Sequence, residues 1–108
     1  MKIPENVKRE LVANEVTSFV VPEDRVRVVT YKKDGQEKTS VFFTLILNGV
    51  SISGCSVGTS KEGKDFISFP SHADKSGKYR SDIYFVFSDD DAAMILKEVE
   101  RIINLPVE

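Results

Sequence analysis

The chain has 108 residues, of which 41% are hydrophobic and 30% charged, and its formal net charge is -2 at pH 7. This length supports one hydrophobic core but not two, so we expect a single domain. The single cysteine, Cys55, excludes an internal disulfide and a multi-cysteine metal site, and we expect a buried, inert thiol. No apolar stretch approaches the roughly 18 residues of a membrane span, and the N-terminus lacks the apolar region of a secretory signal, so we expect a cytoplasmic protein without membrane contact.

Charge is distributed unevenly along the chain. Residues 25–38 carry five basic and two acidic side chains, and residues 51–80 carry five and three. Residues 82–100 carry one basic and six acidic side chains. A basic face opposite an acidic segment is therefore compatible with the nearly neutral total.

The N-terminal third predicts a short helix followed by extended segments. Pro4 suits the first turn of a helix, and apolar residues recur at helical spacing after it, so we expect a helix over Pro4–Asn14. Residues 16–21 predict an extended segment. Residues 25–31 alternate basic and β-branched side chains, which predicts a half-buried strand with a cationic outer face.

The middle of the chain predicts two hairpins. The Asp-Gly pair at residues 34–35 tolerates positive φ and leads into a strand over residues 39–48. This strand is apolar on both faces, so we expect it to be central in the sheet or to place one face against a partner. The Asn-Gly pair at residues 48–49 is the strongest hairpin signal in the sequence, and it predicts a return strand over residues 50–57.

The C-terminal half predicts a short strand, a loop, another strand and a helix. Residues 65–69 predict the short strand, and residues 71–80, which are polar and basic, predict the longest irregular loop. Residues 81–88 predict another apolar strand. Ser88 has a capping-box-like position before three aspartates, and apolar residues then recur at helical spacing, so we expect a helix over residues 89–104.

These elements together predict an α+β fold. We expect an antiparallel meander sheet of about five strands, packed by a C-terminal amphipathic helix and preceded by the short N-terminal helix. The whole chain, residues 1–108, is expected to form one domain. Within it, residues 1–22 form an N-terminal extension, residues 25–88 the sheet and residues 89–104 the C-terminal helix.

The sequence offers little for catalysis or metal binding. His72 is the only histidine, lies in the predicted loop and belongs to no recognisable serine-histidine-acid pattern, so we expect it to be solvated. His72 and Asp74 supply two ligands, whereas a closed zinc site needs about four. Residues 58–65 match a phosphate-binding loop through Lys64, but Asp65 stands where Ser or Thr should hold magnesium, which favours a hairpin turn. We therefore expect no enzyme activity, catalytic residue, metal or small-molecule cofactor.

A basic surface with aromatic neighbours is the remaining functional signal. Cations in the first hairpin, the polar turn and the long loop would neutralise phosphates if they met on one side of the sheet. Tyr79, and Tyr84 or Phe66 if exposed, could stack on unpaired bases. The alternative is that sheet proteins keep lysines on edges and turns to prevent aggregation, and composition leaves both interpretations open. The candidate binding residues are Arg25, Arg27, Lys32, Lys33, Lys61, Lys64, Lys75, Lys78, Tyr79 and Arg80.

The segment from Asn48 to Phe87 contains a spaced set of motif residues. They are Gly63, Phe66, Ile67, Pro70 and Ser71, then Gly77, Tyr79, Arg80, Asp82 and Ile83, with Ser81 as a one-residue insertion. In this pattern the segment resembles the core of the SpoVG family (stage V sporulation protein G), which has a segment like GLFVxMPS, a polar loop and a G-x-[FY]-R-D-I stretch before a helix. The chain departs from the family at Tyr84-Phe85, which replaces His-Pro, in its first 24 residues and in its acidic helix.

The resemblance implies a small α+β dimer that binds DNA or RNA without enzymatic activity, and the departures leave its contact surface open. A weaker likeness is to single-stranded-DNA-binding coactivator-type domains, which also place a curved sheet before a C-terminal helix. We therefore expect a homodimeric nucleic-acid-binding accessory protein with single-stranded DNA as the preferred ligand. Its basic turns are better candidates for the contact surface than its acidic helix, and we expect the phosphates to be held by Lys61, Lys64, Lys75, Lys78 and Arg80. One alternative is a protein-interaction module, such as a phage or mobile-element accessory or inhibitor, that uses its acidic helix or a sheet edge. A third, weaker alternative is an enzyme whose reacting groups are supplied by its substrate.

Overall fold

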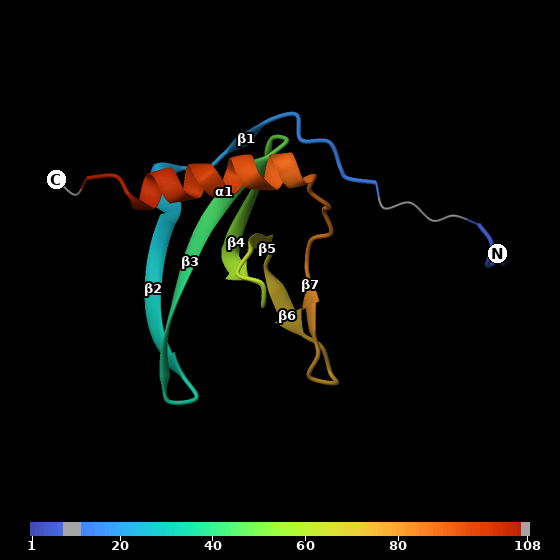
Figure 1. Cartoon of the computed structure of the whole chain (residues 1–108), viewed down its shortest axis with the longest axis horizontal. Helices are drawn as coiled ribbons and strands as arrows, with labels where there is room; N and C mark the ends of the chain where they lie inside the picture. The colour runs from blue at the N-terminus through green and yellow to red at the C-terminus, as the bar shows by residue number, and fades with distance from the viewer. Residues whose placement is uncertain (8–11, 107–108) are drawn as a thin grey trace.

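The computed structural model describes residues 1–7 and 12–106 of the chain. In chain order the elements are β1 (Phe19–Val20), the 3₁₀ helix η1 (Glu23–Arg25), β2 (Val26–Lys33), β3 (Gln36–Leu47), β4 (Val50–Thr59), β5 (Asp65–Ser68), β6 (Ser71–Ala73), β7 (Tyr79–Ser81) and α1 (Asp89–Ile103). In the described chain, β1 to β5 form one curled antiparallel sheet, and β6 and β7 form a separate ribbon. The predicted α+β fold is confirmed. Figure 1 shows α1 across one end of the sheet, with the β2–β3 hairpin and the β6–β7 ribbon projecting away from it.

β3 is the central strand because both of its edges are paired. One edge pairs with β2 and, closer to the end of β3, with β1. The other edge pairs with β4, which in turn pairs with β5. The register of β3 and β4 shifts between Phe43 and Leu45, and such bulges bend and twist a strand. The central position predicted from the two apolar faces of this segment is confirmed.

Two tight turns set the register of β3 with its neighbours. Asp34 and Gly35 have φ values of 53° and 77°, and Asn48 and Gly49 have 51° and 81°. Two successive residues with positive φ define the turn whose twist matches a β-hairpin, so both predicted hairpins are confirmed. The first turn fixes which residues of β2 and β3 face each other.

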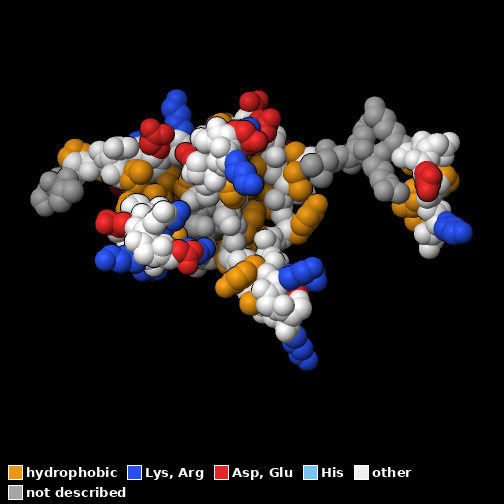
Figure 2. Space-filling view, turned by 60° about the horizontal axis from the view of Figure 1, so that its bottom comes forward, with side chains coloured by type: hydrophobic (Ala, Val, Ile, Leu, Met, Phe, Trp, Pro, Cys, Tyr) orange, Lys and Arg blue, Asp and Glu red, His pale blue; other side chains and the backbone are white. Residues whose placement is uncertain are grey.

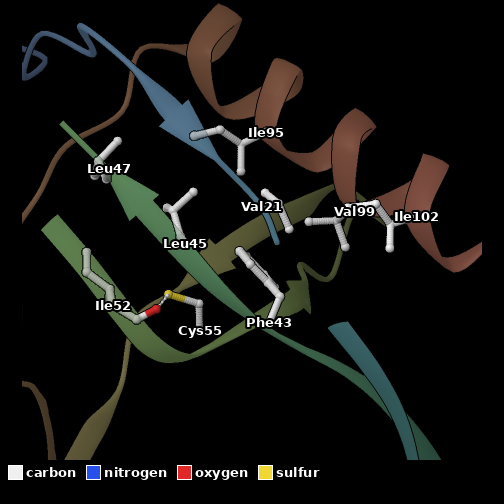
Figure 3. Close-up of a cluster of buried hydrophobic side chains, with 9 residues drawn as sticks. All are labelled: Val21, Phe43, Leu45, Leu47, Ile52, Cys55, Ile95, Val99 and Ile102. Atoms are coloured by element: carbon white, nitrogen blue, oxygen red, sulfur yellow. Dashed lines mark hydrogen bonds between the residues drawn. The ribbon is translucent and has the colours of Figure 1, made fainter. Parts of the chain in front are cut away.

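The core lies between α1 and one face of the sheet. Three buried side chains of α1, Ile95, Val99 and Ile102, pack with alternate residues of β3 (Figure 3). The remaining buried residues of this cluster are Val21, Phe43, Leu45, Leu47, Ile52 and Cys55. The apolar stripe of the helix therefore covers the face of β3 that carries its odd-numbered residues.

The start of α1 and the cysteine also agree with prediction. The Ser88 hydroxyl accepts a 3.1 Å hydrogen bond from the Asp91 amide, so Ser88 caps the helix. Cys55 is fully buried, and this burial raises the pKa of its thiol to about 11. The thiol is therefore protonated at neutral pH and poorly nucleophilic.

The helix predicted over Pro4–Asn14 is not found in the described part of that range. The Val7 amide bonds the Pro4 carbonyl in a single turn, and residues 12–14 have no regular structure. Residues 8–11 lie outside the described residues. The side chains of Val7 and Val12 are exposed, so these two residues of the predicted apolar face lack the packing that stabilises a short helix.

Asn48 fixes the chain that precedes β1. Its side-chain oxygen accepts hydrogen bonds from the amides of Thr17 and Ser18, and its side-chain nitrogen donates to the Glu15 carbonyl. One turn residue therefore holds the predicted extended segment, residues 16–21, beside the end of β3. Only Phe19–Val20 of that segment form a strand.

Residues 71–80, predicted to be an irregular loop, form the β6–β7 hairpin instead. Asp74 organises the turn, because one of its carboxylate oxygens accepts hydrogen bonds from the amides of Ser76 and Lys78. Gly77 has a φ of 83°, which supplies the left-handed residue that this turn requires. The sequence therefore contained a turn signal that the polar composition of the segment obscured.

Residues 81–88, predicted to be a strand, belong to a strand only at their beginning, where Ser81 ends β7. The Asp82 amide still bonds the Pro70 carbonyl, but Pro70 has no amide hydrogen to continue the ladder. Further along, the Val86 carbonyl accepts a 2.7 Å hydrogen bond from the Asn14 amide, but no ladder forms there within the described residues. Ile83, Phe85 and Phe87 nevertheless pack against the core. The alternating pattern of this segment therefore indicates which of its side chains face the core, but it does not indicate that the segment joins a sheet.

Candidate nucleic-acid interface

The sheet has a second face, opposite α1, which we call the outer face. Side chains alternate along a strand, so residues next to core residues such as Phe43 point to this side. On the outer face, the register of β2 and β3 places Arg27 opposite Phe42 and Tyr31 opposite Lys38. The outer face comprises Arg27, Val29, Tyr31 and Lys33 of β2, Gln36, Lys38, Ser40, Phe42, Thr44 and Ile46 of β3, Ser51, Ser53, Ser56 and Gly58 of β4, and Phe66 and Ser68 of β5.

The β2–β3 part of the outer face carries both cations and aromatic rings. The Arg27 guanidinium carbon lies 6.0 Å from the centre of the Phe42 ring, within the range of a cation–π contact. The Ser40 hydroxyl donates a 3.3 Å hydrogen bond to the Tyr31 oxygen across the strands. Arg27 and Lys33 are separated by roughly 20 Å, because each strand residue advances about 3.3 Å. The arrangement is therefore an elongated cationic stripe with rings along it.

Phe66 adds a further ring to the outer face, on β5. Its side chain lies against Gly58 of β4, where an ideal Cβ would come within 2.4 Å of the ring. Gly58 therefore leaves room for the end of the Phe66 ring over β4, and the ring remains 48% exposed. The condition set for Phe66 as a stacking residue, that it be exposed, is met. Tyr84 is also exposed, but it lies outside the outer face, in the segment after β7.

A hollow opens on the outer face beside η1. It has a volume of about 340 Å³, and its lining includes Asp24, Arg25, Arg27, Phe42 and Ser53. An adjoining hollow of about 310 Å³ shares Asp24, Arg25 and Ser53. We call the two together the outer-face hollow. Its walls combine two guanidinium groups, an aromatic ring, hydroxyl groups and one carboxylate.

Of the predicted binding residues in the first hairpin, the structure brings three to the outer face. Arg27 and Lys33 lie on β2, and Arg25 lines the outer-face hollow from η1. Lys32 faces the opposite side of the sheet, where it pairs with Glu37 in the ladder. Adjacent lysines of one strand thus belong to different surfaces.

The predicted residues Lys61 and Lys64 lie in the turn between β4 and β5. The Ser60 amide donates a hydrogen bond to the Lys64 carbonyl, so the segment that resembled a phosphate-binding loop closes the β4–β5 hairpin. This confirms the hairpin turn that was predicted from Asp65. The Lys64 ammonium lies 4.0 Å from an Asp89 carboxylate oxygen at the start of α1. This partner reduces the charge that Lys64 offers to a polyanion.

The other predicted residues, Lys75, Lys78, Tyr79 and Arg80, lie on the β6–β7 ribbon. Arg80 donates a 2.9 Å hydrogen bond to Asp74. Hydrogen bonds from the Ser76 hydroxyl and from Arg80 lower the pKa of Asp74 to about 2, so Arg80 is paired with a carboxylate that stays ionised. Tyr79 is 78% exposed. The ribbon therefore presents its lysines and one free ring but not a free arginine.

The basic residues consequently occupy three places and not one patch. Figure 2 looks toward the projecting hairpins, and its Lys and Arg side chains lie on separate projections with hydrophobic side chains between them. Acidic side chains are mixed with the basic ones on the projection formed by β2 and β3. Among these groups, the outer face combines several cations with several rings, whereas the β6–β7 ribbon offers one exposed ring, Tyr79.

Sequence reasoning missed Lys38, Tyr31 and Phe42 as members of this surface. The sequence did contain the information needed to find them. A two-residue turn at residues 34–35 places residue 33 opposite residue 36, and this pair fixes all the pairs of β2 and β3 further from the turn. Counting back from this turn places Tyr31 opposite Lys38 and Arg27 opposite Phe42. The missing step was to continue the register beyond the turn.

His72 is exposed, and its Nδ1 atom forms a hydrogen bond with the Asp82 carboxylate. In the part of the chain that the structure describes, no three His, Cys, Asp or Glu side chains are grouped so that they could hold a metal ion. Within residues 1–7 and 12–106, no helix is both long enough and apolar enough to cross a bilayer.

The fold and this surface define a small α+β domain whose curled sheet carries a helix on one face and cations with aromatic rings on the other. No protein-family model, curated protein or solved structure matches the chain. The resemblance to the SpoVG family stays a prediction.

Proposed function

We propose that the chain binds single-stranded nucleic acid across the outer face, with single-stranded DNA as the expected ligand, and catalyses no reaction. The observation that carries this proposal is that cations and rings lie on the same face of β2 and β3. Arg27 and Lys33 are interleaved with Tyr31 on β2, and Lys38 and Phe42 face them on β3. Cationic grooves that follow the backbone, combined with rings on which bases stack, are how proteins hold unpaired strands.

A single strand suits this surface better than a duplex. Bases in a duplex are stacked on one another and their faces are inaccessible, whereas unpaired bases can lie on exposed rings such as Tyr31 and Phe66. The stripe from Arg27 to Lys33 is roughly 20 Å long, which accommodates a short stretch of an extended strand.

The distribution of charge also favours binding of the ligand on the outer face. Arg25, Arg27, Lys33 and Lys38 lie on or beside the outer face, and Asp24 is the carboxylate in its hollow. The acidic residues of α1 lie with the helix on the opposite side of the sheet. A polyanion is therefore repelled from the helix side and attracted to the outer face, although the whole chain is nearly neutral.

Fluorescence anisotropy with labelled single-stranded oligonucleotides tests the proposal. If four cations each neutralise one phosphate, the logarithm of the association constant should fall with the logarithm of salt concentration with a slope of about -2.8. The affinity should then drop about 50-fold between about 50 and 200 mM salt. Duplex DNA of the same sequence should bind more weakly than the single strand. A titration with single-stranded RNA of the same sequence shows whether the protein prefers DNA or RNA. Absence of binding to any oligonucleotide at low salt contradicts the proposal.

A homodimer is part of the proposal, and the edge of the sheet supports it. In the described chain β2 pairs with β3 alone, so its second edge is open. Antiparallel pairing of β2 from two copies would join their outer faces into one longer surface. Light scattering coupled to gel filtration measures the mass directly, and a monomer at concentrations well above the binding range contradicts the dimer.

A protein-interaction module is the second candidate function, and a groove between α1 and the sheet favours it. This groove has a volume of about 320 Å³ and is lined by Val41, Val57, Ala93, Leu96 and Ile103, with Asp65, Lys97 and Glu100 among its polar residues. Apolar grooves with charged rims are typical of peptide-binding sites. A partner that is recovered from nuclease-treated extract, and lost with Leu96→Asp, would favour this function over nucleic-acid binding.

A further inference from the structure

Asp24 is the acidic residue of the outer-face hollow, and nucleic-acid binding through phosphates alone gives it no role. A carboxylate next to two arginines weakens the attraction of the surface for a phosphate. Within the described residues, Asp24 forms no ion pair at 4.0 Å or less, so it is not neutralised by Arg25 or Arg27. Asp24 is exposed, so its carboxylate is available to accept hydrogen bonds from a ligand that enters the hollow.

The structure holds Asp24 in place through its neighbours. Glu23 accepts a 3.1 Å hydrogen bond from Arg101 of α1, which ties η1 to the helix. The Arg25 amide donates a 3.0 Å hydrogen bond to the Pro22 carbonyl, which closes the turn of η1. Asp24 lies between these two anchored residues, so the position of its backbone in the hollow is defined before a ligand arrives.

We propose that the outer-face hollow is a base-selecting pocket that prefers guanine and disfavours thymine. The proposal rests on the single-strand binding proposed above and names the specificity of the same surface. The volume of about 340 Å³ lies near the lower end of the range for small-ligand sites, roughly 300 Å³ upward, which fits a nucleobase with part of its sugar. The Phe42 ring forms an apolar wall of the hollow, and Arg25 and Arg27 would contact the flanking phosphates.

The preference follows from what a carboxylate can bond. An ionised carboxylate only accepts hydrogen bonds. The Watson–Crick edge of guanine carries two adjacent N–H donors, which match the two oxygens of Asp24 in a bidentate, charge-assisted pair. Adenine and cytosine present a single amino group. The N–H of thymine lies between two carbonyl oxygens, which the carboxylate repels. Guanine therefore gains most from Asp24 and thymine least.

The test compares two labelled oligonucleotides on the full-length protein at low salt. One is oligothymidylate, and the other is the same oligomer with every third base replaced by guanine. We expect the guanine-containing strand to bind at least about tenfold more tightly, which is within the range that a bidentate base contact provides. Asp24→Ala should abolish this preference and should tighten binding of oligothymidylate, because it removes a negative charge from the surface.

Glu37→Ala is the matched control, because it removes the same charge from the β2–β3 hairpin but on the face opposite the hollow. This variant should keep the preference for guanine. Equal binding of the two oligonucleotides by the unaltered protein, or a preference that survives Asp24→Ala, overturns the base-selecting pocket while the proposed function stands. Failure of both oligonucleotides to bind overturns the proposed function as well. Far-ultraviolet circular dichroism confirms that each variant is folded.

Discussion

Two adjacent lysines of β2 allow the outer face to be tested by substituting neighbours in the sequence. Lys33 faces the outer side with Arg27 and Tyr31, whereas Lys32 faces the side of the sheet that carries α1. Lys33→Gln and Lys32→Gln remove the same charge from the same exposed hairpin end. Neither lysine forms an ion pair within the described residues, so we expect each substitution to change the free energy of unfolding by less than about 0.5 kcal/mol.

The expected difference lies in the salt dependence of binding. Removing one of four phosphate contacts changes the slope for a single strand from about -2.8 to about -2.1. The loss of affinity between about 50 and 200 mM salt then falls from about 50-fold to about 20-fold for Lys33→Gln. Lys32→Gln should keep the original slope, because its side chain is directed away from the ligand.

Anisotropy titrations of one labelled oligonucleotide at several salt concentrations measure both slopes. Thermal unfolding followed by circular dichroism verifies that the two variants are equally stable. The reasoning is refuted if the two substitutions change the slope equally, because binding would then depend on the charge of the hairpin and not on its outer face. A larger effect of Lys32→Gln would refute it more strongly and would place the ligand on the other face.

Three further predictions follow from the aromatic residues and from Asp74. Phe66→Ala should weaken binding by about 1–3 kcal/mol through loss of stacking, whereas Tyr84→Ala, which removes an exposed ring outside the outer face, should leave anisotropy titrations unchanged. Gly58→Ala places a methyl group where the end of the exposed Phe66 ring lies, so the ring must move away from β4; denaturant titration should show a change of about 0.5 kcal/mol or less, whereas anisotropy titration should show weakened binding, and unchanged binding would contradict the close packing. The folded-state pKa of Asp74 is lowered to about 2, so its stabilising effect on the β6–β7 turn is present above the unfolded pKa of about 4 and is lost as the pH falls toward 2. Nuclear magnetic resonance should show the Ser76 amide signal unchanged from pH 7 to about 4 and shifting only below that, and a midpoint near 4 would show that the turn does not hold Asp74 ionised.

Prediction from the sequence succeeded where the determining interactions are short-range. The two turns at residues 34–35 and 48–49 follow from residues that tolerate positive φ, and the start of α1 follows from the Ser88 cap. The central position of β3 follows from its two apolar faces. Each of these signals acts between residues that are close in the sequence, so local composition was sufficient.

Prediction failed where a distant partner or its absence decides the structure. The apolar residues near the N-terminus have helical spacing, but the described side chains of Val7 and Val12 are exposed. Residues 81–88 have the pattern of a strand, but Pro70 ends the ladder that they would have joined. Both segments have the predicted periodicity. The periodicity does not show, however, whether another part of the chain packs against the segment or pairs with it.

The sequence by itself determined the α+β class, the hairpins that contain Asp-Gly and Asn-Gly, the helix after Ser88 and the identity of the basic residues. Only the tertiary structure decided which of these residues share a surface, because strand register and sheet curvature separate Lys33 from Lys32 and place Arg25 beside Phe42. It also paired Arg80 with Asp74 and left Asp24 in a cationic hollow. These arrangements depend on contacts between elements that are far apart in the sequence. The composition of the chain does not show which elements pack together, so it cannot show which side chains come close.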